Sequence, residues 1–279
     1  MQHVWRVLRD KNCGKGIKKE ELGEAMIKTA LTIAGSDPTG GAGLQADLKV
    51  FRYFNVHGLS VVTSLTAQNT NGVDSVFPAE QESFQKQLNV ILSDIKPDAL
   101  KTGMIYNKWM VNIISRSIKE YSLKNLVIDP VSVSSSGKSL MEDGTLDEIK
   151  DKLFPLSKII TPNIYEASIL TGMIIEDTSN MEQAAKALKN MGPEIVVITG
   201  GHLNDIALDL YYDGEFLKIE SEKLKGEYHG TGCAFSAALT ALLALNYSPL
   251  KAVKKAKEFI KEAIKESFRI GKGMSLLKL

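Results

Sequence analysis

The chain alternates between short apolar runs and longer segments in which apolar residues recur at helical spacing. Residues 30–35 form an apolar, β-branched run that predicts a strand, and a loop rich in Gly and turn residues follows. Beyond that loop, Leu44, Leu48 and Phe51 fall on one helical face. The same order recurs along the chain. Further strands are predicted at 58–68, 99–104, 126–131, 157–163 and 194–201, and further helices at 80–95, 107–121, 164–172 and 181–192.

The last third of the chain adds a hairpin and two helices. Asp213-Gly214 stands between two alternating runs, which is typical of a β-hairpin. One helix is predicted after Gly232 and a second after Ser248-Pro249. Strands separated by helices favour parallel crossovers, whose helices cover the sheet. We therefore expect an α/β fold with a central, mostly parallel β-sheet and helices on both faces.

The N-terminal segment differs from the rest of the chain. Residues 1–28 are dominated by Lys, Arg and Glu, and we interpret them as an appendage that is either partly disordered or an interaction helix. Between residues 30 and 270 there is no linker, low-complexity stretch or repeat of fixed period. We therefore predict one domain over residues 29–279.

Composition narrows the choice of partner and compartment. With 34 basic and 33 acidic residues the net charge is +1, so no overall field attracts nucleic acid or an anionic membrane. The longest apolar run, residues 237–245, is shorter than the ~20 residues that cross a bilayer, and charges in the first 28 residues exclude an export signal. Cys13 and Cys233 form no disulfide framework. We expect a cytoplasmic protein that acts on a small molecule.

The strongest local feature is His229-Gly230-Thr231-Gly232-Cys233, which leads directly into a predicted helix. Glycines let the backbone approach a ligand, and the unpaired N–H groups of a first helical turn bind anions such as phosphate. Cys233 lies in that turn, where the helix field stabilises a thiolate. The turn is either an anion site with a base beside it or a Gly-rich cap with a small buried cysteine.

Two other phosphate-binding patterns are incomplete. Residues 41–46 fit G-x-G-x-x-A, but the chain lacks the acidic residue expected about twenty positions later. This argues against a nicotinamide-dependent dehydrogenase. Residues 132–139 approach the P-loop pattern, but Ser132 stands where that pattern requires Gly.

Polar residues follow several of the predicted strands. In an open parallel sheet these loops meet at one edge, where ligands bind. Asp129 lies near the end of one of these strands, and it either helps to bind a metal or caps its loop. Asn163 and Glu166 face a Mg²⁺ ion or form a helix capping box. Gln68 either hydrogen-bonds the edge of a heterocycle or hydrogen-bonds within its own turn. Met104 either contacts the substrate or fills a gap in the core.

In combination the motifs resemble the hydroxymethylpyrimidine/phosphomethylpyrimidine kinases of thiamine synthesis, within the ribokinase-like superfamily. The resemblance covers about residues 30–265 and rests on GSDPTGGAGLQADLK, TAQNTNGV, KTGM, IDPV, TPNIYEA, TGGH and HGTGC, in this order. It implies a ribokinase-like fold and ATP as phosphoryl donor. It also implies phosphorylation of 4-amino-5-hydroxymethyl-2-methylpyrimidine and then of its monophosphate.

The resemblance assigns roles to residues that match the family motifs. The implied base and anion hole are Cys233, Gly230, Thr231 and Gly232. The implied substrate pocket comprises Gln68 at the aminopyrimidine edge, together with Met104, Val131, Gly35 and Asp37. The implied nucleotide site comprises Asn163, Thr199, Gly200 and Gly201. Asp129 and Glu166 are implied to act on Mg²⁺ through its waters.

The chain departs from the family in three places. Thr199 stands where the family commonly has Lys, residues 134–137 lack a Lys often found before Ser-Gly, and the C-terminal tail is reduced to GKGMSLLKL. Two alternatives therefore stay open. One is a pyridoxal or pyridoxine kinase, and the other is a non-catalytic pyrimidine or thiamine sensor. We also expect a homodimer that contacts neither nucleic acid nor membrane.

Overall fold

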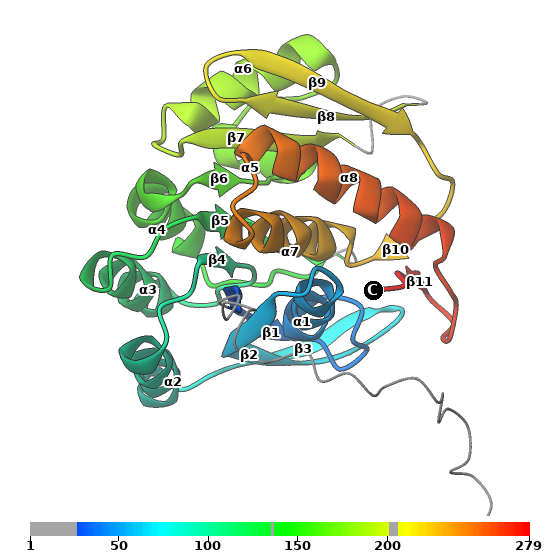
Figure 1. The fold of residues 1–279 in the computed structure, drawn as a ribbon. Coiled ribbons are helices and arrows are strands. Elements are labelled where there is room, and N and C mark those ends of the chain that lie inside the picture. The colour runs from blue at the N-terminus through cyan, green and yellow to red at the C-terminus, as the bar shows by residue number, and fades with distance from the viewer. Residues whose placement is uncertain (1–26, 135–136, 201–205) are drawn as a thin grey trace, which may run out of the picture.

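The structure, a computed structural model, describes residues 27–134, 137–200 and 206–279. Within these residues a nine-stranded sheet has the order β3-β2-β1-β4-β5-β6-β7-β8-β9 (Figure 1). The strands from β2 to β7 in this order are parallel, whereas β3, β8 and β9 pair antiparallel. The strand bounds are β1 Thr29–Ser36, β2 His57–Asn69, β3 Gly72–Pro78, β4 Ala99–Thr102, β5 Leu126–Ile128, β6 Ile159–Ile160, β7 Ile195–Gly200, β8 Ile206–Tyr212 and β9 Phe216–Glu222.

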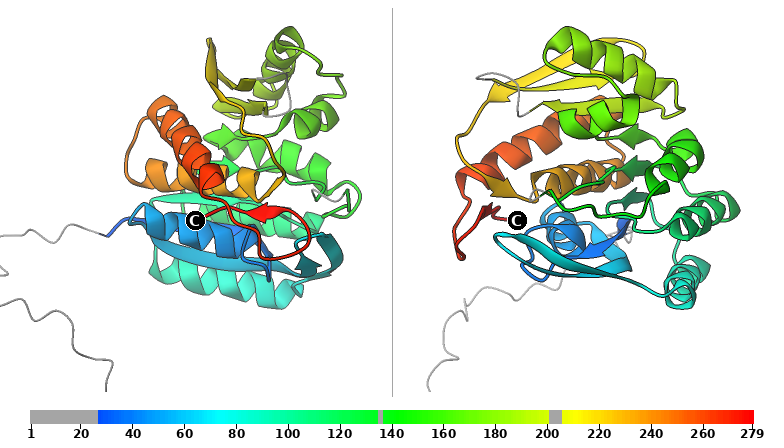
Figure 2. Two further views of the ribbon diagram at one scale, coloured as in Figure 1. Left: turned by 90° about the vertical axis from the view of Figure 1, so that its right-hand side faces the viewer. Right: turned by 180° about the vertical axis from the view of Figure 1, so that it is seen from behind.

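Helices cover both faces of this sheet, and each face has its own apolar core (Figure 2). One face carries α1 (Gly43–Tyr53), α7 (Thr231–Ala244) and α8 (Pro249–Lys265). The other carries α2 (Gln81–Asp94), α3 (Lys108–Glu120), α4 (Thr145–Lys152), α5 (Ile164–Thr171) and α6 (Thr178–Lys189). The predicted α/β fold, with a mostly parallel sheet between two helical layers, is confirmed.

The order of the strands reverses at β1. The chain continues from β1 to β2 on one side of it, and β4 lies on the other side. Such a reversal opens a crevice beyond the carboxyl ends of the strands, where open α/β sheets bind ligands. Helix α7 packs against β1, β4 and β5, so its N-terminus lies near this reversal.

Several short elements of the described chain were not predicted from the sequence. Strand β3 includes Asp74 and ends at Pro78, both of which are unfavourable in a central strand but tolerated at the edge that β3 occupies. Helix α4 buries only Thr145 and Ile149, so it has no apolar stripe. The small sheet of β10 (Tyr228–His229) and β11 (Ser275–Leu276) depends on pairing between distant segments.

In the described part of the chain, no helix combines the length and apolar character that a membrane crossing requires. The predicted division into an appendage, residues 1–28, and a domain, residues 29–279, stays a prediction because residues 1–26 lie outside the described residues. Cys13 lies in that segment.

Candidate active site

Helix α7 begins at Thr231, two residues before the start that was predicted after Gly232. Gly230 is its N-cap residue in a left-handed conformation, with φ of 84°, and no side chain caps the helix. A Cβ on Gly230 would lie 1.8 Å from the carbonyl oxygen of Gly41, whereas a Cβ on Gly232 would meet only open space. Since no side chain caps the first turn, its N–H groups can bind an anion.

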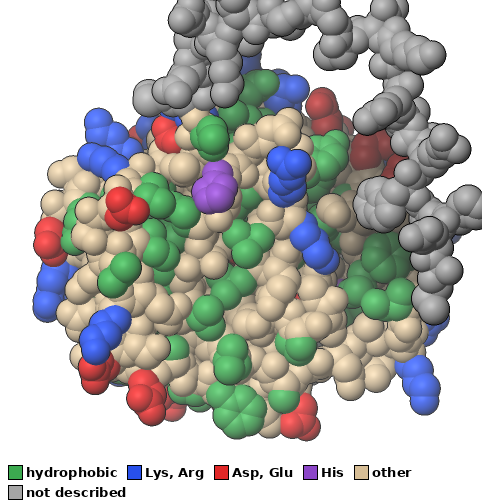
Figure 3. Space-filling model, turned by 60° about the horizontal axis from the view of Figure 1, so that its bottom comes forward, with side chains coloured by type: hydrophobic (Ala, Val, Ile, Leu, Met, Phe, Trp, Pro, Cys, Tyr) green, Lys and Arg blue, Asp and Glu red, His purple; other side chains and the backbone are tan. Residues whose placement is uncertain are grey.

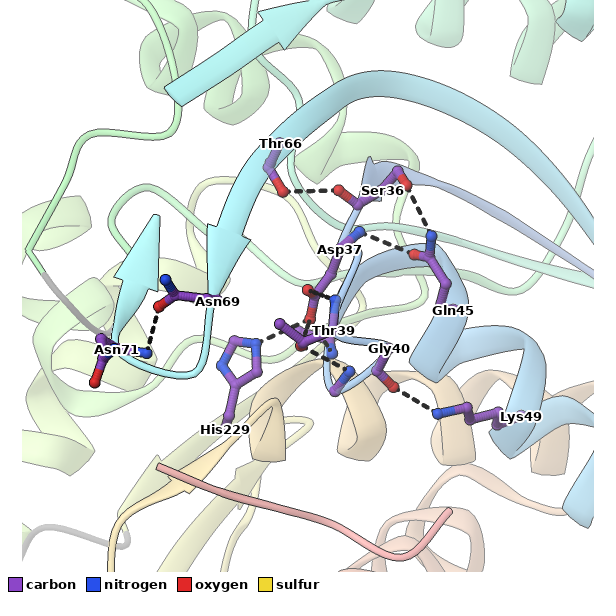
Figure 4. Close-up of polar contacts among 12 residues, drawn as sticks. Ser36, Asp37, Thr39, Gly40, Gln45, Lys49, Thr66, Asn69, Asn71 and His229 are labelled. Atoms are coloured by element: carbon purple, nitrogen blue, oxygen red, sulfur yellow. Dashed lines mark hydrogen bonds and ion pairs between the residues drawn. The ribbon is translucent and has the colours of Figure 1, made fainter. Parts of the chain in front are cut away.

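Asp37 joins the loop after β1 to the strand that precedes α7 (Figure 4). Its carboxylate accepts hydrogen bonds from the backbone N–H of Thr39 at 2.8 Å and of Ala42 at 2.8 Å. It also accepts from the hydroxyl of Thr39 at 2.9 Å and from Nε2 of His229 at 2.9 Å. Burial opposes ionisation, but the hydrogen bonds from His229 and Thr39 prevail and lower the pKa of Asp37 to about 2. Asp37 is therefore an ionised anchor, and its predicted contact with substrate stays a prediction.

Cys233 is half-buried in the first turn of α7, so it is not sealed inside the protein. The backbone N–H of Gly43 and the Asp129 carboxylate lie close enough to the thiol to act on its ionisation. Burial and the charge of Asp129 raise the pKa of the Cys233 thiol to about 12, although Lys101 opposes this shift. The predicted stabilisation of a thiolate is therefore wrong for the protein without ligands, because burial and a neighbouring carboxylate outweigh the helix field.

A buried ion pair lies beneath this turn. Nζ of Lys101 in β4 is 2.8 Å from Oδ1 of Asp47 in α1, and both side chains are 0% exposed. The Thr32 hydroxyl donates to Asp47 at 2.6 Å, and Lys101 reaches the Cys233 carbonyl at 3.4 Å. Burial lowers the pKa of Lys101, but the nearby acids outweigh it and raise that pKa above its usual value. Burial also raises the pKa of Asp47, which Lys101 and Thr32 oppose.

Sequence reasoning missed both members of this pair. Lys101 could have been noticed because it is the one charged residue in a short strand whose residues are all buried, and lysine is rarely buried without a partner. Asp47 gave a weaker signal, since it stands on the helix face next to Leu44, Leu48 and Phe51.

Asp129 and Glu166 form an acidic pair near the thiol. The Ser236 hydroxyl donates to Asp129 at 3.0 Å. Burial raises the pKa of Asp129, and burial together with the Asp129 charge raises the pKa of Glu166 to about 8. The predicted capping box is also present: the Asn163 N–H donates to Glu166 at 2.9 Å, and the Glu166 N–H donates to Asn163 at 2.9 Å.

This acidic pair suits a divalent cation that arrives with phosphates. Both carboxyl groups are buried with a raised pKa, and a cation between them would stabilise their ionised forms. In residues 27–134, 137–200 and 206–279, no group of three or more His, Cys, Asp or Glu side chains is arranged to hold a metal. Mg²⁺ matches this arrangement because it retains waters and takes few protein ligands.

Two of the predicted nucleotide-site residues are brought side by side. The Thr199 N–H donates to the Pro162 carbonyl at 2.9 Å, and Thr199 forms a parallel bridge with Asn163. Gly201, the fourth predicted member, lies outside the described residues. The end of β7 and the start of α5 are thus joined by backbone pairing.

The end of β7 is fastened to a second buried ion pair. The Gly200 N–H donates to Oδ1 of Asp209 at 3.1 Å, and Oδ2 of Asp209 is 2.7 Å from Nζ of Lys257 in α8. A Cβ on Gly200 would lie 2.0 Å from the Leu208 carbonyl oxygen, so the strand pairing requires glycine here. Sequence reasoning did not assign Asp209 or Lys257.

The predicted substrate residues lie on two sides of β1. A Cβ on Gly35 would be 3.0 Å from the sulfur of Met104, so these residues adjoin. Val131 is half-buried just beyond β5. Gln68 follows a register shift between β2 and β3, and irregularities of this kind re-aim side chains near binding sites. In the described part of the chain, the side-chain amide of Gln68 makes no hydrogen bond.

A family model described as phosphomethylpyrimidine kinase matches residues 37–278. The chain belongs to this kinase family. The hydroxymethylpyrimidine/phosphomethylpyrimidine kinase of Bacillus subtilis is 42% identical over 251 residues, which cover 88% of this chain and 93% of that protein. The pyridoxine kinase of the same organism is 44% identical over 246 residues, which cover 86% and 91%.

Solved structures confirm the ribokinase-like architecture of this kinase. The ADP complex of Bacillus subtilis pyridoxal kinase has a TM-score of 0.84 and 42% identity, covering 90% of this chain and 97% of that one. Phosphomethylpyrimidine kinase from Clostridium difficile has a TM-score of 0.75 and 39% identity, covering 85% and 99%. The chain is therefore a phosphotransferase, and its predicted membership is confirmed.

Proposed function

We propose that this kinase transfers phosphate from ATP to the hydroxymethyl group of 4-amino-5-hydroxymethyl-2-methylpyrimidine and then to the monophosphate. One observation carries the proposal: the uncapped first turn of α7, held by Gly230 and beside Cys233, lies near the strand reversal. Phosphoryl transfer needs positioning and neutralisation of charge more than covalent chemistry, and N–H groups at a helix N-terminus supply both.

Gln68 supports an aminopyrimidine as acceptor. Its amide offers an acceptor and two donors on one planar group, which complements a ring nitrogen next to an exocyclic amine. Gly35 and Met104 adjoin each other, and Met104 and Val131 supply apolar surface for the ring. Two relatives of this chain bear the name hydroxymethylpyrimidine/phosphomethylpyrimidine kinase at 42% and 39% identity.

ATP is supported as donor by relatives solved with ADP and with AMP-PCP. We assign the nucleotide to Asn163, Thr199, Gly200 and Gly201. Mg²⁺, when bound with the nucleotide, neutralises phosphate charge, and Asp129 and Glu166 are the residues that would hold it through its waters. We infer that the protein binds the pyrimidine, the nucleotide and the metal, and that it contacts neither nucleic acid nor membrane.

Cys233 is assigned as the group that receives the proton of the alcohol. As the new oxygen–phosphorus bond forms and the bond from the γ-phosphorus to the bridging oxygen breaks, the hydroxyl proton must leave. Because the pKa of the Cys233 thiol is raised to about 12, sulfur can accept this proton only as its own proton passes to the neighbouring Asp129 carboxylate.

A pyridoxal or pyridoxine kinase is the second candidate, because the pyridoxine kinase of Bacillus subtilis is 44% identical. The test is a coupled ADP-release assay with purified protein, using the aminopyrimidine alcohol, pyridoxal and no acceptor. We expect turnover to be greatest with the aminopyrimidine, and mass spectrometry to show products with one and two added phosphates. Greater turnover of pyridoxal would favour the second candidate. If ADP release does not rise when any of the acceptors is added, a non-catalytic sensor would be favoured.

We further propose a cytoplasmic homodimer. Leu65 and Phe77 pair across β2 and β3, and each is 58% exposed. Figure 3 brings the lower side of Figure 1 forward and shows apolar side chains across this face, with many charged side chains toward its margin. We assign the Leu65–Phe77 pair to the contact between the two copies, because adjacent large apolar side chains on a surface favour association. Light scattering coupled to size exclusion tests the proposal, and a monomer mass at micromolar concentration would reject it.

A further inference from the structure

Lys101 occupies an unusual position for a lysine. It lies in β4 next to the strand reversal, its side chain is fully buried, and it connects three elements. Its ammonium pairs with Asp47 of α1 at 2.8 Å and points a further N–H at the Cys233 carbonyl of α7 at 3.4 Å. The same carbonyl lies 3.0 Å from the Ser236 hydroxyl.

Stability alone does not account for this arrangement. Apolar side chains of similar size usually replace a buried ion pair without loss of stability, because both charges must be removed from water. Lys101 nevertheless places a positive charge directly beneath the turn whose N–H groups face an anion. Asp47, held in turn by the Thr32 hydroxyl at 2.6 Å, fixes the direction of that charge.

We propose that Lys101 is a positioning residue for phosphoryl transfer, acting through the Cys233 carbonyl to hold the first turn of α7 and to keep a fixed positive charge beneath it. This inference rests on the proposed function. The Lys101 charge should stabilise the transition state, in which negative charge moves onto the transferred phosphoryl group. A charge held in place in the protein interior does not have to reorganise during that step. Binding of substrates in their ground state should change little.

The test replaces both charges so that neither is left buried alone. The double variant Lys101→Met with Asp47→Asn keeps the volumes and removes the ion pair. The matched control, Lys86→Met with Glu82→Gln, removes an exposed ion pair on α2 whose partners are 2.6 Å apart. Each protein is assayed for kcat, for the KM of nucleotide and acceptor, and for thermal unfolding. Calorimetry then measures the binding of ADP alone and of ADP with aluminium fluoride, in the presence of magnesium.

For the double variant we expect kcat to fall about 100-fold, as when a preorganised donor is removed, with both KM values within about threefold. Its unfolding temperature should stay close to that of the parent, because no charge is left buried without a partner. Binding of ADP should be unchanged, whereas aluminium fluoride should no longer tighten the complex. The surface control should match the parent in every measurement.

Parental kcat in the double variant would overturn the proposal, and so would a matched loss of kcat, KM and thermal stability. If the double variant does not fold, Asp47→Asn alone decides. This variant leaves Lys101 with an oxygen acceptor, so kcat should fall less than about fivefold. A 100-fold fall in kcat would show that the Asp47 charge is required, and it would overturn the role proposed for Lys101 alone. The calorimetric measurement needs no acceptor, so it tests the role of Lys101 independently of the proposed function. A parent protein that phosphorylates no pyrimidine would reject the proposed function, and calorimetry would still test Lys101.

Discussion

Two buried ion pairs support the two ends of the site, and they do so differently. Lys101 and Asp47 lie wholly inside the protein, and the lysine contacts a carbonyl of the α7 turn. Lys257 and Asp209 are 10% and 9% exposed, and it is the aspartate that contacts an N–H group, that of Gly200. The first pair places a cation beneath the anion site. The second orients the backbone at the end of β7, and its aspartate rather than its lysine contacts the strand that is predicted to bind nucleotide.

The contrast assigns different tasks to the two ends. The α7 end carries the thiol, the uncapped N–H groups and the fixed cation, so changes there should affect kcat. The β7 end carries Thr199 and Gly200, which are predicted to contact nucleotide, so changes there should affect the KM of ATP.

The largest effect is expected at the thiol. Cys233→Ala should lower kcat by ~10² to 10⁴, because a group that takes up the alcohol proton is lost, while the KM of the pyrimidine stays within about threefold. Steady-state kinetics measure both quantities. The matched variant on the other side, Thr199→Ala, should raise the KM of ATP about fivefold, as expected for one lost hydrogen bond, with kcat nearly unchanged. Unchanged turnover in Cys233→Ala would remove the role assigned to the sulfur.

The next effect concerns stability. Lys101→Met alone leaves the Asp47 carboxylate buried without its cation, which should cost ~3–5 kcal/mol in the free energy of unfolding. Lys257→Met should cost less, because water reaches Asp209 more readily. Urea denaturation measures both variants. Equal losses would show that the difference in exposure between the two pairs has no energetic consequence.

A smaller effect is expected when the second pair is removed as a unit. Lys257→Met with Asp209→Asn should raise the KM of ATP about tenfold, since the Gly200 N–H loses its ionised partner, and should leave kcat within about twofold. Initial-rate measurements at saturating acceptor resolve the two constants. A selective loss of kcat would contradict the division of tasks.

The last effect concerns the dependence of stability on pH. The folded-state pKa of Glu166 is raised from 4.5 to about 8, so the folded protein binds more protons than the unfolded chain between these values. Stability should therefore decrease as pH rises from about 5 to 8. Glu166→Gln, whose amide oxygen still accepts from Asn163, should flatten this slope in thermal unfolding. Magnesium with nucleotide should flatten it in the parent, and a slope that neither change alters would exclude Glu166 as its source.

The sequence predicted what depends on neighbouring residues. Apolar spacing placed most of the strands and helices, and the glycines on either side of Thr231 marked the start of α7 to within two residues. Asn163 and Glu166 form the capping box that their spacing favours. These features require only a few consecutive residues, and each therefore leaves a local pattern.

Tertiary structure decided what depends on packing. His229 meets Asp37 across 192 positions, and Lys101 reaches Cys233 across 132, so no local pattern records either contact. The direction of the shift in the Cys233 pKa was also predicted wrongly, because it depends on burial and on Asp129 rather than on the helix that carries the thiol. Position in the helix is written in the sequence, whereas the charges and the dielectric around a side chain are set only when distant segments pack together.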